Sequence, residues 1–155
     1  MMTNYLLALA AGSLLLLGSC NKEDVLPEGC PIQEVPTTAI AGWDASPYCF
    51  ATPVANGSLP QSYVVNSASE LQALNHCPSV PNIDFARYTL LIGKTKTAAC
   101  SSVKTQLVTR SCTQYTYKVE LAAGLCQAST EVLYYALVPK VADGEKVVFE
   151  VVPPS

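Results

Sequence analysis

Residues 115–121 read Tyr-Thr-Tyr-Lys-Val-Glu-Leu and alternate strictly between apolar and polar side chains. A period of two is typical of a β-strand that buries one face, so the four apolar side chains are expected to face a core. Thr116, Lys118 and Glu120 are then expected to face solvent. Residues 146–152 alternate in the same way. The chain is therefore predicted to be rich in β-strand.

The remaining elements follow from shorter signals along the chain. Residues 67–70, Ser-Ala-Ser-Glu, form a capping box, which predicts a helix over residues 68–75 that ends before Pro78. Residues 131–138 are apolar on both faces, so this strand is predicted to be central. Strands are predicted at residues 61–66, 88–93, 103–109, 115–121, 131–138 and 146–152. The expected fold is mainly β, an antiparallel sheet or a sandwich-like or barrel-like domain with one short helix.

Length and composition limit the class of protein. The chain has 155 residues, of which 50% are hydrophobic and 14% are charged, with a formal net charge of −3. This size suits one domain with a tail, and the composition excludes a disordered chain, a collagen and a coiled coil. The small negative charge argues against nucleic acid as the main partner. Basic and acidic residues balance within residues 37–155, so the net charge comes from the segment before them.

The N-terminal segment carries signals for export. Residues 6–17 are almost purely apolar but shorter than the about 20 residues that cross a bilayer, so they are expected to be a signal-peptide core. Residues 17–20, Leu-Gly-Ser-Cys, resemble the lipobox of bacterial lipoprotein precursors. The resemblance implies that residues 1–19 are removed and that Cys20 carries fatty acyl chains such as palmitate. The alternative is an ordinary secretory signal, with Cys20 later pairing in a disulfide.

The segment after Cys20 has the composition of a tether. Residues 21–24, Asn-Lys-Glu-Asp, resemble the surface-export signal of Bacteroidota lipoproteins, which implies the outer face of the outer membrane. A plain charged spacer would instead leave the protein facing the periplasm. The expected organisation is a signal peptide over residues 1–19, a lipidated, Pro-rich and acidic tether over residues 20–36, and one β-rich domain over residues 37–155.

Six cysteines remain besides Cys20, and an even number in an exported chain predicts three disulfides. The chain has no Cys-x-x-Cys motif and a single His, so neither a metal site nor a cofactor is expected. The strands between residues 88 and 138 are expected to form an antiparallel meander, whose connections alternate between the two ends of the sheet. Cysteines in connections at the same end can then pair. The predicted disulfides are Cys100–Cys126 and Cys77–Cys112, which leave Cys30–Cys49 as the third.

Three strings carry a resemblance to a family. They are residues 82–93, Asn-Ile-Asp-Phe-Ala-Arg-Tyr-Thr-Leu-Leu-Ile-Gly, residues 117–121, Tyr-Lys-Val-Glu-Leu, and residues 134–140, Tyr-Tyr-Ala-Leu-Val-Pro-Lys. They resemble small, mostly uncharacterised lipoproteins of Bacteroidota. More distantly, they resemble the C-terminal domain of a protease-complex lipoprotein that stabilises a surface protease. The resemblance implies a β-rich domain with an accessory role and carries over no catalytic residue.

Two sets of side chains are candidates for binding. Trp43, Tyr48 and Phe50 lie in a turn-rich segment and could stack on a sugar or a protein, or could form a flap that closes the core. The flap is the favoured interpretation, because Trp43 is the only Trp. Between Arg87 and Lys118 the chain has six basic residues and no acidic one. They could form a face for an anionic partner, although separate, solvated positions are the favoured interpretation.

Signals for catalysis are weak in this chain. Residues 93–95, Gly-Lys-Thr, resemble the end of a phosphate-binding loop, but the Gly required five residues earlier is missing, and a strand-end turn is expected instead. His76 is the only His, and no Gly-x-Ser-x-Gly elbow accompanies it. Asp44, Asp84, Glu120 and Glu131 could form a carboxylate pair for glycoside hydrolysis, but their spacing does not indicate one. Asp84 is expected instead to cap or turn the chain before the strand that starts at residue 88.

The expected function is therefore interaction and not catalysis. The chain is predicted to be an outer-membrane lipoprotein that acts as an accessory module for an envelope or surface protein, such as a protease. The alternative is a glycan- or solute-binding module that exposes its three candidate aromatic side chains around a groove. A hydrolase is the third interpretation and would need His76 in a cleft beside an acid.

Overall fold

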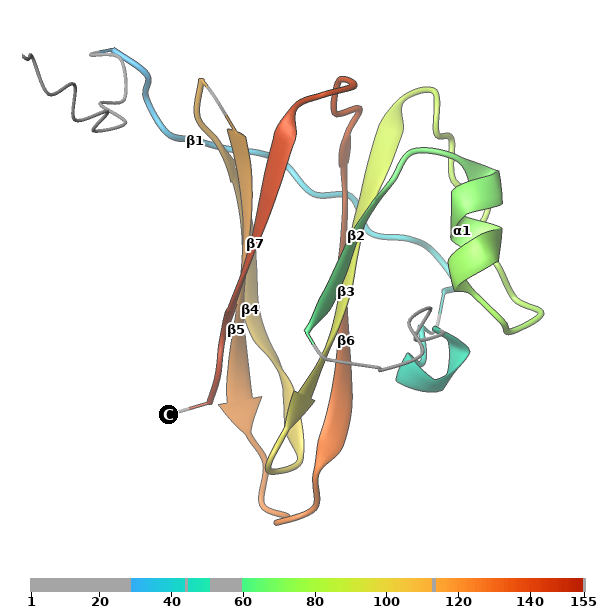
Figure 1. Ribbon diagram of the computed structural model, residues 1–155, viewed down its shortest axis with the longest axis vertical. Coiled ribbons are helices and arrows are strands. Elements are labelled where there is room, and N and C mark those ends of the chain that lie inside the picture. The colour runs from blue at the N-terminus through green and yellow to red at the C-terminus, as the bar shows by residue number, and fades with distance from the viewer. Residues whose placement is uncertain (1–28, 44, 51–59, 113, 155) are drawn as a thin grey trace, which may run out of the picture.

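The computed structural model describes residues 29–43, 45–50, 60–112 and 114–154. This part of the chain is mainly β and forms two stacked sheets, with one α-helix and a short 3-10 helix (Pro47–Cys49) outside them (Figure 1). The two sheets stay separate and do not close into a barrel, so the sandwich-like form of the predicted fold is confirmed. Among the described residues, no helix is long and apolar enough to cross a membrane.

The strands divide into a sheet of four and a sheet of three. The order is β1-β4-β5-β7 in the four-stranded sheet and β2-β3-β6 in the three-stranded sheet. Neighbouring strands are antiparallel except β5 and β7, which run parallel. The strands are β1 (Gln33–Glu34), β2 (Gln61–Val65), β3 (Tyr88–Thr97), β4 (Ser101–Arg110), β5 (Gln114–Ala123), β6 (Thr130–Pro139) and β7 (Lys146–Val152).

Strand β3 shows why the predicted meander is wrong. β3 does not pair with β4, the next strand along the chain, but lies between β2 and β6. The chain crosses to the other sheet after Thr97 and returns between β5 and β6 (Figure 1). Nearly every side chain of β3 is buried, because one face meets the four-stranded sheet and the other is covered by a third layer. β3, and not the strand over residues 131–138, is therefore the central strand of its sheet.

The core between the two sheets contains the alternating side chains of β5. The four side chains of β5 predicted to face inward are buried, which confirms this prediction. The Tyr117 ring lies edge-on to Tyr134 of β6 and to Phe149 of β7, with ring centroids 5.9 and 5.7 Å apart. Gly93 of β3 lies against the Tyr134 ring, where a Cβ atom would collide with it. A residue without a side chain at this position thus leaves room for the aromatic ring between the sheets.

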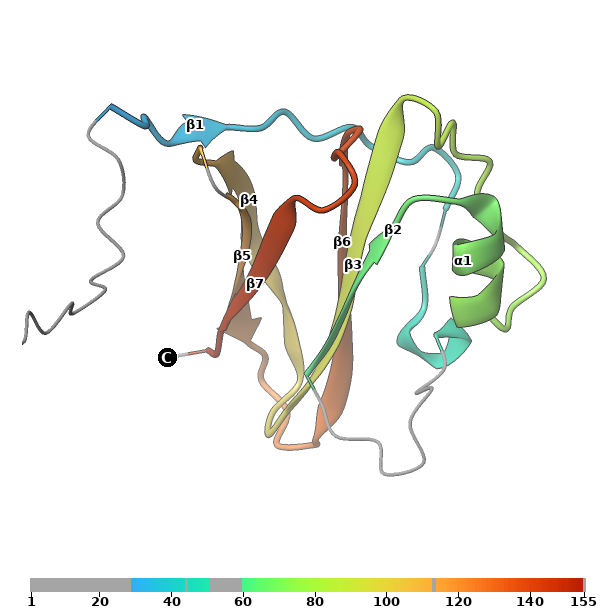
Figure 2. The ribbon, with the colours of Figure 1, turned by 45° about the horizontal axis from the view of Figure 1, so that its top comes forward.

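A third layer covers the outer face of the three-stranded sheet (Figure 2). Helix α1 (Ala68–Leu74) begins after Ser67, whose hydroxyl accepts a hydrogen bond from the Glu70 N–H. The Glu70 carboxylate in turn accepts one from the Asn66 N–H at 2.6 Å. The predicted capping residues therefore fix the start of the helix. Leu71 is buried and attaches the helix to the sheet.

Residues 30–40, which we call the strap, join the edges of the two sheets (Figure 2). Strand β1 pairs with β4, the Val35 N–H donates to a β4 carbonyl at 2.8 Å, and the Thr38 N–H donates to a β6 carbonyl at 2.8 Å. Residues 30–36 are therefore part of the fold, which corrects the predicted domain start at residue 37. The prediction relied on the linker-like composition of this segment. Backbone hydrogen bonds attach the segment to the sheets, and such bonds leave no pattern in the sequence.

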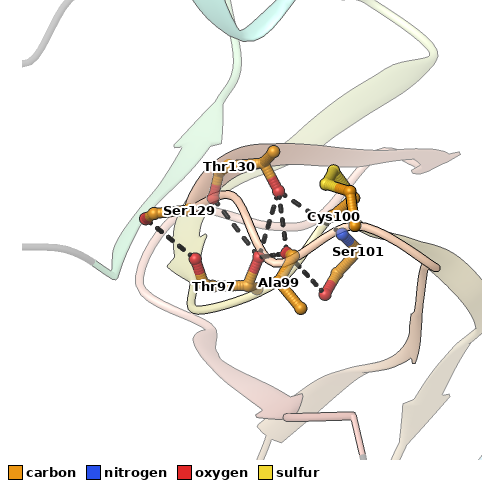
Figure 3. The surroundings of a disulfide bond; sticks show 7 residues. Thr97, Ala99, Cys100, Ser101, Ser129 and Thr130 are labelled. Atoms are coloured by element: carbon orange, nitrogen blue, oxygen red, sulfur yellow. Dashed lines mark hydrogen bonds between the residues drawn. A yellow bond between two sulfur atoms is a disulfide. The ribbon is translucent and has the colours of Figure 1, made fainter.

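One predicted disulfide, Cys100–Cys126, is confirmed and lies where the chain crosses between the sheets (Figure 3). Hydroxyl groups join the two crossings beside it. Thr97 Oγ1 donates to the Ala99 carbonyl at 2.6 Å, and Thr130 Oγ1 donates to the same carbonyl at 3.0 Å. The covalent link and these hydrogen bonds hold the β3–β4 crossing against the β5–β6 crossing.

The other two predicted disulfides, Cys77–Cys112 and Cys30–Cys49, are wrong. The structure pairs Cys30 with Cys112 and Cys49 with Cys77. Cys30 meets Cys112 because the strap pairs with the end of β4, next to the β4–β5 turn. Cys49 meets Cys77 because the His76 N–H donates to the Cys49 carbonyl at 2.8 Å. Both errors came from assuming that the connections belong to a single sheet.

Candidate functional site

The candidate lipid attachment site lies outside the described residues. This holds for Cys20, for the predicted signal peptide over residues 1–19, and for residues 21–28 of the predicted tether. The described chain begins just before Cys30, which is held to Cys112 at one end of the sandwich. The described part of the chain therefore starts at the end of the sandwich where β4 and β5 are joined.

Residues 40–50, which we call the flap, carry the three aromatic candidates. Trp43 and Phe50 are 9% and 6% exposed, whereas Tyr48 is 92% exposed. The Trp43 ring packs on Phe50 and on Tyr135 of β6, with centroids 5.9 and 4.7 Å apart. The interpretation as a flap over the core is confirmed. Of the three side chains only Tyr48 is exposed, whereas the alternative of a glycan-binding module required all three to be exposed around a groove.

Lys94 of β3 holds the flap to the sheet. Its side chain is only 7% exposed, and its Nζ lies 3.0 Å from the Glu131 carboxylate. Nζ also donates to the Phe50 carbonyl at 3.1 Å and to the Pro47 carbonyl at 3.5 Å. A buried ammonium group is destabilising unless it is paired and hydrogen-bonded, so these contacts explain why a Lys is tolerated here. β3 continues beyond this position, so the strand-end turn predicted here is wrong.

Other residues of the predicted basic stretch also have acidic partners. Besides Lys94, Arg110 Nη2 lies 2.6 Å from the Glu145 carboxylate, and Lys118 Nζ lies 3.0 Å from that of Glu120. Hydrogen bonds from Lys118 and from a β4 threonine hold the pKa of the Glu120 carboxyl below its usual range. Three of the six basic residues in the stretch therefore make ion pairs within the fold.

The residues weighed for catalysis lie apart from one another. His76 is exposed after helix α1 and lines none of the cavities described below. Asp84 turns the chain into β3 as predicted, with its carboxylate accepting a backbone N–H two residues on. Glu120 and Glu131 lie on different sheets, and Asp44 lies outside the described residues. Within the described ranges, no group of three His, Cys, Asp or Glu side chains could hold a metal ion.

Two tyrosines, Tyr117 and Tyr134, are buried between the sheets. Burial, with Tyr134 and Tyr135 nearby, raises the pKa of Tyr117 well above its ordinary value. The Tyr117 hydroxyl donates to Gln106 Oε1 of β4 at 2.7 Å. Burial also raises the pKa of Tyr134. These hydroxyls therefore stay protonated at neutral pH and stabilise the core.

Two cavities open between the edges of the sheets. On the strap side, a cavity of about 510 Å³ lies between the strap, β4 and β6. A second cavity, of about 620 Å³, lies toward the other side, at the end of the sandwich where β3, β5 and β7 come together. We call this cavity the groove. Apolar residues from four segments line it, including Pro60, Ala98, Leu121, Ala123, Val151 and Pro153. No sequence pattern marks the groove, because these positions are far apart along the chain.

The groove lies beside two strand edges that have no partner among the described residues. β2 pairs only with β3, and β7 pairs only with β5. On the opposite side of the sandwich, the strap spans the edges of β4 and β6. Unpaired edges offer backbone N–H and C=O groups to another chain. The side with β2, β7 and the groove, which we call the open side, is therefore the candidate interaction surface.

No protein-family model matches the chain, and comparisons with curated proteins and with solved structures likewise found no match.

Proposed function

We propose that the protein is a lipid-anchored accessory module of the outer membrane that binds an envelope or surface protein. The open side carries this proposal, because an apolar groove of about 620 Å³ lies beside the unpaired edges of β2 and β7. An extended segment of a partner can hydrogen-bond to a strand edge while one of its apolar side chains fills a cavity. The Cys100–Cys126 disulfide lies next in sequence to Ala99, which lines the groove.

The lipobox resemblance at residues 17–20 supports the membrane location in this proposal. The tether would lead from Cys20 to Cys30, which is fixed to Cys112 at the β4–β5 turn. The groove lies at the other end of β5, about 30 Å away for a ten-residue strand. A partner can therefore approach the groove without meeting the point at which the tether enters the domain.

The two other interpretations have less support. A glycan- or solute-binding module rests on the exposed Tyr48 alone, because Trp43 and Phe50 belong to the core. A hydrolase requires His76 in a cleft, whereas this side chain is exposed and lines neither cavity. The family resemblance in residues 82–93 also favours an accessory role, since it brings no catalytic residue.

The groove is tested by changing two neighbouring alanines to the same residue. Ala123 lines the groove, whereas Ala122 alternates to the opposite face of β5. Detergent-solubilised outer membranes are passed over tagged wild-type, Ala123→Arg and Ala122→Arg chains, and bound proteins are identified. We expect wild type and Ala122→Arg to retain the same envelope protein and Ala123→Arg to lose it, because a charge fills the apolar cavity. Equal capture by all three chains, or binding to a glycan array without a protein partner, contradicts the proposal.

The lipid anchor is tested separately by metabolic labelling with radioactive palmitate. We expect the wild-type chain to be labelled and to fractionate with the outer membrane. Cys20→Ala removes the thiol that accepts the lipid, so this variant is expected to lose the label and to keep the residues 1–19 that cleavage before position 20 removes. An unlabelled wild-type chain, or a Cys20→Ala chain that matures and fractionates as before, contradicts the anchor.

A further inference from the structure

Strand β7 is an apolar edge strand. Its sequence, Lys-Val-Val-Phe-Glu-Val-Val, contains four valines and one phenylalanine, and in the described chain only β5 pairs with it. Its apolar side chains are half-buried or exposed, with Val152 40% exposed. A long apolar edge strand tends to pair with a strand of another chain unless a helix or loop covers it. The positions of the charged side chains in β7 indicate which strand is complementary to it.

The charges of β7 are complementary to a second β7 that runs in the opposite direction. Side chains that face each other across an antiparallel pair must lie on the same face of the sheet. The two-fold axis must therefore lie midway between the two copies of one residue, which is then opposite itself. With the axis at Val148, Lys146 lies opposite Glu150 of the second copy, and Glu150 lies opposite its Lys146. Val148 then lies opposite Val148 of the second copy. Both charged side chains are exposed on the outer face, where they can make these pairs.

A neighbouring register is less favourable. With the axis at Phe149, Lys146 would lie opposite Val152 of the second copy, and Glu150 would lie opposite its Val148. Each charged side chain would then face an apolar, β-branched one, and both attractive cross-strand pairs would be lost. The alternation of charges therefore selects the register centred on Val148.

The rest of the sheet leaves Glu150 available for this contact. Its neighbour on β5 in the parallel register is Lys118. The ammonium group of Lys118 already lies 3.0 Å from the Glu120 carboxylate. We propose that the protein forms a two-fold dimer through β7, in which the four-stranded sheets of two copies join into one continuous sheet. This inference does not depend on the lipid anchor or on the groove. The dimer would occupy the edge of β7 and leave the edge of β2 to the partner of the proposed function.

A charge exchange tests both the dimer and its register. The full chain in mild detergent is studied by sedimentation, as wild type and as the variants Lys146→Glu and Glu150→Lys. Each variant alone is expected to dimerise about tenfold more weakly, because two attractive cross-strand pairs become two repulsive ones. An equimolar mixture of the two variants is expected to recover the wild-type affinity, because every pair is again of opposite charge. Lys104→Glu, an exposed position on β4, is the control and is expected to leave dimerisation unchanged.

A wild-type chain that stays monomeric at every soluble concentration overturns the proposal, and so does a mixture that dimerises no better than its components. Cross-linking gives a second test that does not rely on the charge variants folding well. Val148→Cys places a thiol on the two-fold axis and is expected to form an intermolecular disulfide under mild oxidation. Val152→Cys, on the same face, lies opposite Gly144 of the second copy and is expected not to. Equal cross-linking at both positions contradicts the register.

Discussion

Lys94 shows how one charged side chain fixes a layer of this fold. Trp43 and Phe50 give the flap its apolar contact with the sheet. The carbonyls of Pro47 and Phe50 lie in the same layer, and buried carbonyls need hydrogen-bond donors. The Lys94 ammonium group donates to both, and Glu131 balances its charge. The polar backbone of the flap can therefore lie against an apolar sheet.

Lys94→Met is expected to destabilise the protein by about 1–3 kcal/mol, because the Phe50 carbonyl loses the Lys94 donor while the apolar stem is kept. The Pro47 carbonyl still accepts a hydrogen bond from the Phe50 N–H. Glu131 is 38% exposed, so its unpaired carboxylate adds little. Urea unfolding followed by fluorescence measures the loss, and acrylamide quenching of Trp43, the only Trp, reports whether the flap opens. Lys96→Met, an exposed position two residues along β3, is the control. Equal stability of the two variants would show that the flap does not depend on Lys94.

The difference between Trp43 and Lys94 shows which residue roles could be predicted. The burial of Trp43 follows from the side chain itself, and the turn at Asp84 follows from a local hydrogen bond. Lys94 has its partners at positions 47, 50 and 131, far from it along the chain. The sequence around it suggests only a solvated charge. Its role could not be predicted without knowing which segments meet.

At the scale of elements, the strands could be predicted but their neighbours could not. Alternation in β5 is a local property, so its buried face follows from the sequence. Pairing depends on which strand lies beside which, and β3 differs here because both of its faces are covered. The groove and the open side follow from sheet order, so no local signal predicts them. The strap has the composition of a linker and yet pairs with β4.

Removing the strap disulfide with Cys30→Ser/Cys112→Ser tests how the strap is held. Loop-closure entropy gives a loss of about 4.5 kcal/mol for a sequence separation of 82, against about 3.5 kcal/mol for Cys100→Ser/Cys126→Ser with a separation of 26. Urea unfolding measures both losses.

Removing each of the two disulfides is expected to loosen a different part of the fold. Hydrogen exchange at the Val35 and Thr38 amides is expected to become faster only in the Cys30→Ser/Cys112→Ser variant, because these N–H groups bond the strap to β4 and β6. Unchanged protection at both amides in this variant would show that hydrogen bonds alone hold the strap.

At the scale of the whole molecule, tyrosines connect the two sheets. Tyr117 of β5 contacts Tyr134 of β6 and Phe149 of β7, and it donates a hydrogen bond to Gln106 of β4. These contacts link strands from both sheets at the centre of the core. Because burial raises the pKa of Tyr117 and of Tyr134, the folded state favours the protonated form of both hydroxyls more than the unfolded state does. Alkaline pH is therefore expected to lower the stability of the whole sandwich and not of one strand alone.

The free energy of unfolding is expected to be independent of these tyrosines below about pH 10 and to fall as the pH rises further. In that range the unfolded chain releases phenolic protons near the ordinary pKa of about 10, while the folded core retains them, so the unfolded state is favoured. Urea midpoints from about pH 9 to about pH 12, with tyrosinate absorbance, measure this slope. Tyr117→Phe is expected to reduce the slope while lowering stability at neutral pH by about 1 kcal/mol, through the lost hydrogen bond to Gln106. A slope unchanged by Tyr117→Phe would mean that this hydroxyl does not limit alkaline stability.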